Sequence, residues 1–264
     1  MTKPTPEEAL PRERQQWILD RLRSHVRVVA VELAETFRVS EDSVRRDLRD
    51  LAAQGLCKRV YGGALPLSAA SMPLKQRRQE HGARKLALAH KAVTLVRQGQ
   101  VLLIDAGSTN AAIAAALPEN LGLTVVTNAP DVARILIDRE GFDILLIGGR
   151  IDATIGAAIG AQAIKDIGRV RADMCFPGAC AIDAERGLWS FDSEEALLKR
   201  AMIEASGETV VVVTQEKLGS AATHHVAGLA EVQHLVIEHS VSRATRLAFS
   251  TRGVVVHRAE AVSN

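Results

Sequence analysis

Aromatic side chains are scarce in this sequence of 264 residues, and only three cysteines are present: Cys57, Cys175 and Cys180. None forms a CxxC pair and three cannot build a disulfide framework, so a disulfide-stapled scaffold is excluded and a reducing compartment is favoured. No apolar run approaches the roughly 20 residues that a membrane-spanning helix needs, and the first residues are too polar for a signal peptide. We therefore expect a cytoplasmic protein without a membrane partner.

The spacings that hold metal ions or mark a nucleophile are also missing. His224 and His225 are adjacent rather than four residues apart, and Cys175 and Cys180 have no partner pair at zinc-site spacing. A Ser-His-Asp triad stays open, but no G-x-S-x-G motif accompanies it. We predict no metal ion, no cofactor and no catalytic residue.

The small net charge of +2 conceals an asymmetry along the chain. Residues 1–100 hold 19 Lys and Arg against 11 Asp and Glu, whereas residues 101–264 hold 14 against 20. A basic first part indicates a polyanionic partner such as nucleic acid. A solvated basic linker is the alternative, because most of the excess lies between Leu65 and Gln100.

Three short helices are predicted in the first 55 residues. Apolar residues at helical spacing predict helices over 10–25 and 31–37, and the latter is followed by a tight turn. Ser40 is a good N-cap for a third helix that begins at Glu41, and Gly55 is a good terminator. This is the outline of a helix-turn-helix.

The third helix predicts a buried stripe and an exposed basic face. At about 100° per residue, Val44, Leu48 and Leu51 share one side. The opposite side carries Asp42, Arg46 and Arg49, flanked by Ser43 and Arg45. A merely solvated face, with Arg46 paired to Asp42, is the alternative. The next segment, LCKRVYGGA, predicts a hairpin or wing that carries Lys58, Arg59 and Tyr61.

After a small-residue linker and a basic helix over 74–97, the sequence changes in character. Short apolar runs (VLLID, LTVVTN, DILLIG, ADMCF, ETVVVVT, QHLVIE, GVVVH) alternate with helical segments such as AAIGAQAIKDI and SEEALLKRAMIEAS. Such alternation predicts a mostly parallel sheet covered on both faces. We predict three segments: a helix-turn-helix DNA-binding domain over 1–64, a linker and connecting helix over 65–100, and an α/β domain over 101–264.

Polar turns follow three of these strands and should meet at the carboxyl edge of the sheet. They contain Asp105, Gly107, Ser108 and Thr109, then Thr127 and Asn128, then Gly148, Gly149 and Arg150. The GST turn before a helix is a natural cradle for a phosphate or carboxylate. Asp183, Lys199 and Lys217 follow later strands, and the lysines could neutralise a phosphate, although each alone is more typical of a solvent-facing residue.

The segment VSEDSVRRDLRDLAAQGLCKRVYGGA resembles the winged helix-turn-helix signature of the DeoR family of bacterial transcription regulators. DAGST, TVVTN, LIGGR and FPGACAID resemble the sugar-sensing domain of that family in the same order. The resemblance implies a DNA-binding regulator, usually a repressor, whose C-terminal domain is similar in fold to ribose-5-phosphate isomerase and binds a phosphorylated sugar or related metabolite.

The resemblance also assigns residues to roles. Operator DNA would be contacted by Ser40, Ser43, Arg45, Arg46, Arg49, Lys58, Arg59 and Tyr61. The phosphate would be held by Asp105, Gly107, Ser108 and Thr109, with Thr127, Asn128, Gly148, Gly149 and Arg150 along the cleft and Asp183, Lys199 and Lys217 closing it. Use of a palindromic operator implies a homodimer or homotetramer.

The sequence departs from the family pattern at several positions. Val29 stands where a Thr or Ser usually caps the second helix, which costs about 1 kcal/mol locally. Where the family tends to have an Asp and Ser before the late lysine, this chain reads Thr214-Gln215-Glu216-Lys217, and Ala181 replaces a glycine. The last changes line the expected pocket, so they bear on the identity of the effector.

Two other functions remain open. A sugar-phosphate isomerase or lyase would need clustered acids, but Gly178, Ala179 and Cys180 stand where an acid pair is expected, leaving Asp183 and Glu195. Turnover of a sugar phosphate would support this alternative. An activator or DNA-organising protein that ignores small molecules would not need the second domain.

Overall fold

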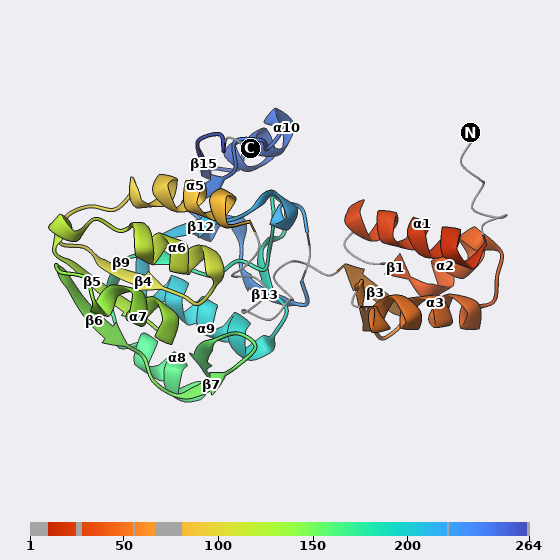
Figure 1. Cartoon of the computed structure of the whole chain (residues 1–264), viewed down its shortest axis with the longest axis horizontal. Coiled ribbons are helices and arrows are strands. Elements are labelled where there is room, and N and C mark those ends of the chain that lie inside the picture. The colour runs from red at the N-terminus through yellow and green to blue at the C-terminus, as the bar shows by residue number, and fades with distance from the viewer. Residues whose placement is uncertain (1–9, 25–27, 55, 67–80, 221, 263–264) are drawn as a thin grey trace. The chain divides into compact units, whose positions relative to one another are not determined.

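The computed structural model describes residues 10–24, 28–54, 56–66, 81–220 and 222–262. The chain divides into two compact units, Met1–Ser68 and Ala69–Asn264 (Figure 1). Within the described residues, no helix combines the length and apolarity needed to cross a bilayer.

The first unit packs three helices against a small antiparallel sheet of order β1-β3-β2. Its elements are α1 Pro11–Ser24, β1 Val28–Val29, α2 Ala30–Phe37, α3 Glu41–Ala53, β2 Cys57–Val60 and β3 Gly63–Pro66. The core includes Ile18 of α1, Leu33 and Phe37 of α2, and the stripe of α3. Val44, Leu48 and Leu51 are each at most 2% exposed, so the predicted buried side of the third helix is confirmed.

The ends of α2 and α3 follow the predicted capping pattern. The Ser40 hydroxyl accepts the N–H of Ser43 at 3.3 Å and caps α3. Val29 precedes α2 and gives no side-chain cap, as its apolar side chain dictates. Arg38 ends α2 in the left-handed region at φ 51° and turns the chain towards α3. Gln54 stands at the C-cap of α3, and Gly55, the predicted terminator, lies outside the described residues.

The second unit is built on a seven-stranded parallel sheet of order β15-β14-β12-β9-β4-β5-β6. Its strands are β4 Val101–Ile104, β5 Leu123–Thr127, β6 Phe142–Leu146, β9 Ala172–Phe176, β12 Ser206–Val212, β14 His234–Ile237 and β15 Val255–Arg258. Each corresponds to one of the seven apolar runs predicted as strands. The α/β class and the winged helix-turn-helix before it are therefore confirmed.

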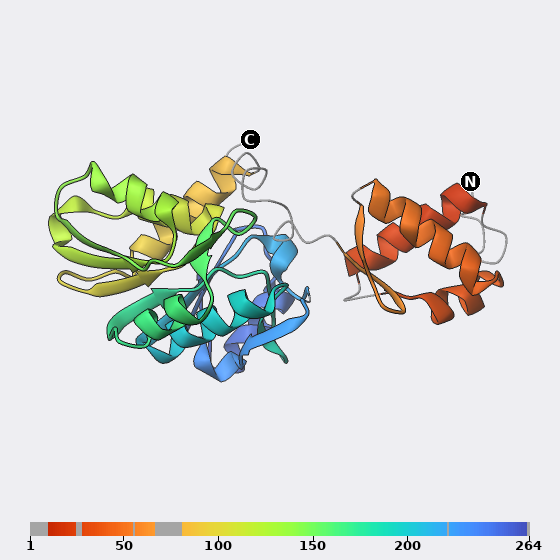
Figure 2. The same cartoon turned by 90° about the horizontal axis from the view of Figure 1, so that it is seen from below.

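Helices cover both faces of this sheet (Figure 2). One face packs against α5 Gly82–Val93, α6 Ser108–Ala116 and α7 Pro130–Ile137. The other packs against α8 Ala161–Ile167, α9 Ser193–Glu204 and α10 Arg243–Ser250. Burial on both sides explains why the strands read as continuous apolar runs instead of alternating patterns.

Smaller elements complete the second unit. They are the hairpin β7 Arg150–Asp152 with β8 Ala157–Ile159, and an antiparallel sheet of β10 Ala181–Asp183, β11 Gly187–Ser190 and β13 His224–Ala227. Three single turns of 3-10 helix are η3 Glu119–Leu121, η4 Gln215–Lys217 and η5 Leu229–Glu231. Sequence reasoning did not predict any of them.

Two predicted helical segments differ from the structure. In AAIGAQAIKDI, Ala157–Ile159 forms strand β8, and Gly160 separates it from α8. The basic helix predicted over 74–97 is found as α5 from Gly82 to Val93, while 67–80 lies outside the described residues. Leu88, Ala89 and Ala92 of α5 are fully buried in the second unit, so α5 belongs to that unit rather than to a separate connecting segment.

Candidate functional site

The exposed side of α3 carries the guanidinium groups that sequence reasoning singled out. Arg46 and Arg49 are exposed and, within the described part of the chain, have no ion pair. Arg45 instead is bound to Glu41 at 2.6 Å and lies 3.9 Å from Asp42. The alternative in which Arg46 pairs with Asp42 is therefore wrong, and Arg46 and Arg49 keep free donors within the described residues.

The serines at the start of α3 are engaged with each other. The hydroxyls of Ser40 and Ser43 lie 3.0 Å apart, and Ser40 also caps the helix. Both hydroxyls therefore already serve the fold, although both side chains remain at least partly exposed.

The wing is a hairpin of β2 and β3 whose two glycines have separate roles. Gly62 occupies the turn with φ 79°, a region that favours glycine. A Cβ on Gly63 would lie 1.9 Å from the Val28 carbonyl oxygen, so only glycine lets β3 pair with β1. Tyr61 at the tip is fully exposed and Arg59 is exposed; the side chain of Lys58 lies outside what is described.

A hollow of about 520 Å³ lies between α3 and the wing. Its lining includes Glu41 and Arg45 from α3 and Arg59, Tyr61 and Gly62 from the wing. Basic and aromatic side chains around a concave surface beside a helix-turn-helix suit contacts to a phosphate backbone.

In the second unit, the carboxyl edge of the sheet holds a buried ionic cluster. Lys199 of α9 lies 2.9 Å from the Asp105 carboxylate and 2.5 Å from that of Glu195. Lys199 and Asp105 are each 1% exposed. Burial alone would lower the pKa of Lys199, but the two carboxylates outweigh burial and raise that pKa above its ordinary value. The ammonium is therefore charged and compensated by the two acids.

The cluster also fixes the chain around it. The Asp105 carboxylate accepts the N–H groups of Ala106 at 2.7 Å and Gly178 at 2.8 Å. A Cβ on Gly178 would lie 2.7 Å from the Ala106 carbonyl oxygen, so this close approach requires glycine. Glu195 accepts the Ser190 hydroxyl at 2.7 Å.

Sequence reasoning named Asp105 and Lys199 but not the roles of Glu195, Ser190 and Gly178. The i,i+4 spacing of Glu195 and Lys199 was an available signal.

A second group of predicted residues gathers around β5 and β8. The Thr127 hydroxyl donates to the Ile104 carbonyl at 2.6 Å, and the Asn128 amide nitrogen donates to the Ala158 carbonyl at 3.2 Å. Asn128 is 1% exposed, and its side-chain oxygen has no hydrogen-bond partner within the described residues. Gly149, with φ 138°, lies close to Ala158 and Ile159. These residues leave one buried acceptor unused.

The turn before α6 keeps its predicted form. Gly107 has φ 138°, and a Cβ there would meet nothing within 4 Å. The first N–H groups of a helix have no intrahelical partner, so the turn offers donors to an anion. Ser108 is partly exposed and Thr109 is buried.

The remaining predicted residues are more dispersed. The Lys217 ammonium donates to the Ala179 carbonyl at 2.7 Å, next to Gly178 and the ionic cluster. Arg150 is exposed and paired with Glu194 at 2.6 Å, and Gly148 is exposed. Asp183 accepts the N–H groups of Glu185 and Arg186 in the β10–β11 turn, so its carboxylate serves that turn.

Comparison with known proteins supports both units. The family model described as the DeoR-like helix-turn-helix domain matches residues 14–69, and that of the DeoR C terminal sensor domain matches residues 80–239. The "Glycerol-3-phosphate regulon repressor" of Escherichia coli (strain K12) is 35% identical over 221 residues, covering 83% of this chain and 88% of the relative. The "Putative aga operon transcriptional repressor" of Escherichia coli O157:H7 is 28% identical and covers 92% of each chain.

Among solved structures, ribose 5-phosphate isomerase A from Methanocaldococcus jannaschii resembles part of the chain. It is 19% identical, covers 53% of this chain and 55% of its own, and gives a TM-score of 0.39. A likeness of this extent identifies no activity.

Proposed function

The chain belongs to the DeoR family of DNA-binding transcriptional regulators, and from this we propose that it represses a carbohydrate catabolic operon under the control of a phosphorylated sugar or related metabolite. The first unit would bind operator DNA, and the second would bind the effector and alter operator affinity. The observation that carries the proposal is the exposure of Arg46 and Arg49, with no ion pair in the described part of the chain, on the second helix of a helix-turn-helix.

On DNA, α3 would enter the major groove and the wing would rest on the neighbouring backbone. Arg46 and Arg49 have free guanidinium forks, the geometry that reads a guanine or holds a phosphate. Arg45 is already paired with Glu41 through one nitrogen, so we assign it a phosphate contact and not base reading. Two recognition helices must lie about one DNA turn apart, or a multiple of it, on a palindrome, so we propose a homodimer or homotetramer.

In the second unit, we assign the phosphate to the turn Gly107–Thr109 at the start of α6, helped by Lys217. The unused Asn128 oxygen would accept a sugar hydroxyl. We assign Asp105 and Lys199 to support of the site instead of direct contact, because both are buried and compensate each other. Because the Asp105 carboxylate and the Lys199 ammonium are paired with each other, neither is free to act as a general acid or base. We therefore propose that the cluster does no catalysis.

Operator binding by the purified protein tests the proposal as a whole. DNA from the upstream region of its own gene should bind specifically, and the affinity should fall as salt rises from 50 to 200 mM, as expected for release of counterions from phosphate contacts. One member of a panel of glycerol 3-phosphate, pentose phosphates and hexose phosphates should shift that affinity by about 5- to 150-fold, the ordinary range of allosteric coupling. Absence of specific binding would overturn the regulator, and absence of any shift would remove the phosphorylated effector.

Arg46→Ala should weaken operator binding by about 1–3 kcal/mol, or about 5- to 150-fold, because a bidentate contact to a base is lost. Titration against operator DNA at fixed salt measures this. Arg12→Ala is the matched control: it removes an exposed arginine from α1 of the same unit and should change affinity less and without sequence preference. Equal affinities of Arg46→Ala and the unaltered protein would remove Arg46 from the DNA contact.

A further inference from the structure

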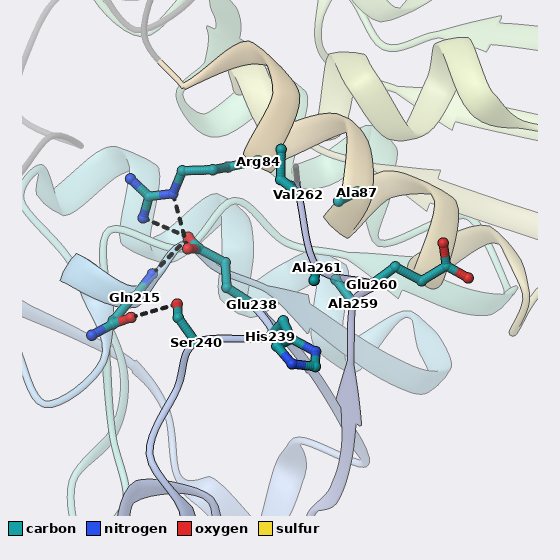
Figure 3. Close-up of a pocket in the computed structure, with 10 residues that line it drawn as sticks. All are labelled: Arg84, Ala87, Gln215, Glu238, His239, Ser240, Ala259, Glu260, Ala261 and Val262. Atoms are coloured by element: carbon teal, nitrogen blue, oxygen red, sulfur yellow. Dashed lines mark hydrogen bonds and ion pairs between the residues drawn. The ribbon is translucent and has the colours of Figure 1, made fainter. Parts of the chain in front are cut away.

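Arg84, in the first turn of α5, is held by two carboxylates from distant parts of the second unit (Figure 3 shows Arg84 and Glu238). Its guanidinium donates twice to Glu238, at 2.9 and 2.6 Å, and once to Glu216, at 2.8 Å. Glu238 follows β14 and is only 8% exposed. A forked, charge-assisted contact of this kind fixes orientation as well as distance.

The same carboxylate also holds η4. Glu238 accepts the backbone N–H of Gln215 at 3.0 Å, and the Gln215 side-chain oxygen accepts the Ser240 hydroxyl at 2.9 Å (Figure 3). Because Glu216 is the central residue of η4, Arg84 touches η4 directly through Glu216 and indirectly through Glu238. The first turn of α5 and η4 are therefore tied at two points.

The other end of η4 reaches the candidate effector site. Lys217 donates to the Ala179 carbonyl at 2.7 Å, and the N–H of Gly219 donates to the Ile182 carbonyl at 2.8 Å. Ala179 adjoins Gly178, whose N–H is held by Asp105. Since η4 is only three residues long, a shift of its backbone at Lys217 would displace Glu216 and Gln215 as well.

We propose that Arg84, Glu216 and Glu238 form a latch that transmits occupancy of the effector site through η4 to α5. The inference rests on the proposed function and names how that function would be regulated. In sequence, α5 is the first described element after the wing, so a change in its first turn acts at the start of the effector-sensing unit. A ligand can shift η4 only through contacts that differ between the free and the bound state. The contact of Lys217 with the Ala179 carbonyl is one that a bound phosphate would replace.

Arg84 and Glu238 line a pocket of about 410 Å³, and this pocket does not suit a phosphate itself. Arg84 is already opposed by two carboxylates, and Glu260 also lines the pocket. The hydrogen bond to Glu238 raises the pKa of Arg84. Burial works to raise the pKa of Glu216, but hydrogen bonds from its own N–H, Thr214 and Arg84 outweigh burial and lower it. Arg84 and Glu216 therefore meet as charged groups near neutral pH, and we expect their contact to open by displacement.

Glu216→Gln tests the latch because it removes the negative charge from the direct tie to η4 and leaves the Arg84–Glu238 fork in place. Operator affinity would be measured with and without the panel member that shifts the unaltered protein most, and binding of that compound by calorimetry. We expect the affinities of the variant for operator and for compound each to stay within about twofold of those of the unaltered protein. The ratio of operator affinities with and without compound should fall towards 1. Arg84→Lys keeps the charge but loses the fork, and should keep part of the coupling.

Arg97→Gln is the matched control, since Arg97 forms a single exposed pair with Glu208 in the same unit. It should leave the coupling ratio unchanged. Hydrogen exchange gives a readout that needs no effector: Glu216→Gln should speed exchange at Lys85 and in η4, and Arg97→Gln should not.

Unchanged exchange, or an unchanged coupling ratio, would overturn the latch even if the protein responds to a sugar phosphate. Exchange could instead become faster in a protein whose operator affinity no compound alters. The tie between α5 and η4 would then exist, but the proposed control by an effector would be wrong. The role of the latch in transmitting that control would be wrong with it.

Discussion

Lys199→Met should lower the free energy of unfolding of the second unit by about 3–5 kcal/mol, the usual cost of removing one partner from a buried ion pair. The methionine fills a similar volume, so the loss comes from the charges of Asp105 and Glu195 that remain buried without compensation. Calorimetric or chemical unfolding of the full chain measures it.

Two variants separate charge from packing in this prediction. Lys165→Met removes an exposed lysine from the neighbouring helix α8 and should change stability by less than about 0.5 kcal/mol. The triple variant Lys199→Met, Asp105→Asn, Glu195→Gln removes all three charges and should recover part of the loss. A Lys199→Met protein as stable as the unaltered one would show that the cluster is not the support of the site.

The features that sequence reasoning predicted correctly are those determined locally. The seven apolar runs are strands of one sheet that is covered on both faces. Burial on both faces favours apolar residues at consecutive positions, so the run is visible in the sequence. The start of α3 was readable from Ser40 and the acids after it, and its buried stripe from helical spacing. The absence of a cap before α2 followed from Val29 alone.

The features that were missed depend on distant partners. The strand Ala157–Ile159 looks like the start of a helix because Ala and Ile suit both; the backbone bond from Ala158 to the Asn128 carbonyl decides the outcome. The fork of Arg84 with Glu238 joins residues 154 positions apart. Lys199 was readable as a cation near the strand ends, but its burial between two acids was not.

The buried pair of Arg14 and Asp47 leads to a comparable prediction for the DNA-binding unit. The Arg14 Nε lies 2.5 Å from the Asp47 carboxylate, Gln15 donates to the same carboxylate at 3.2 Å, and both charged side chains are less than 10% exposed. The pair joins α1 to the recognition helix α3. Asp47→Ala should therefore destabilise this unit by about 3–5 kcal/mol, because the guanidinium is left buried without its partner.

A unit of this size has only about 3–10 kcal/mol of stability, at about 0.05–0.15 kcal/mol per residue. Asp47→Ala would consume much of it, so operator binding should fall although Asp47 is buried on the side of α3 away from the exposed arginines. Thermal unfolding and operator titration together distinguish this from Arg46→Ala, which should weaken binding without lowering stability. Asp50→Ala, at an exposed position on the same helix, is the control and should change neither. An unchanged unfolding midpoint for Asp47→Ala would mean that the pair contributes nothing to the position of the recognition helix.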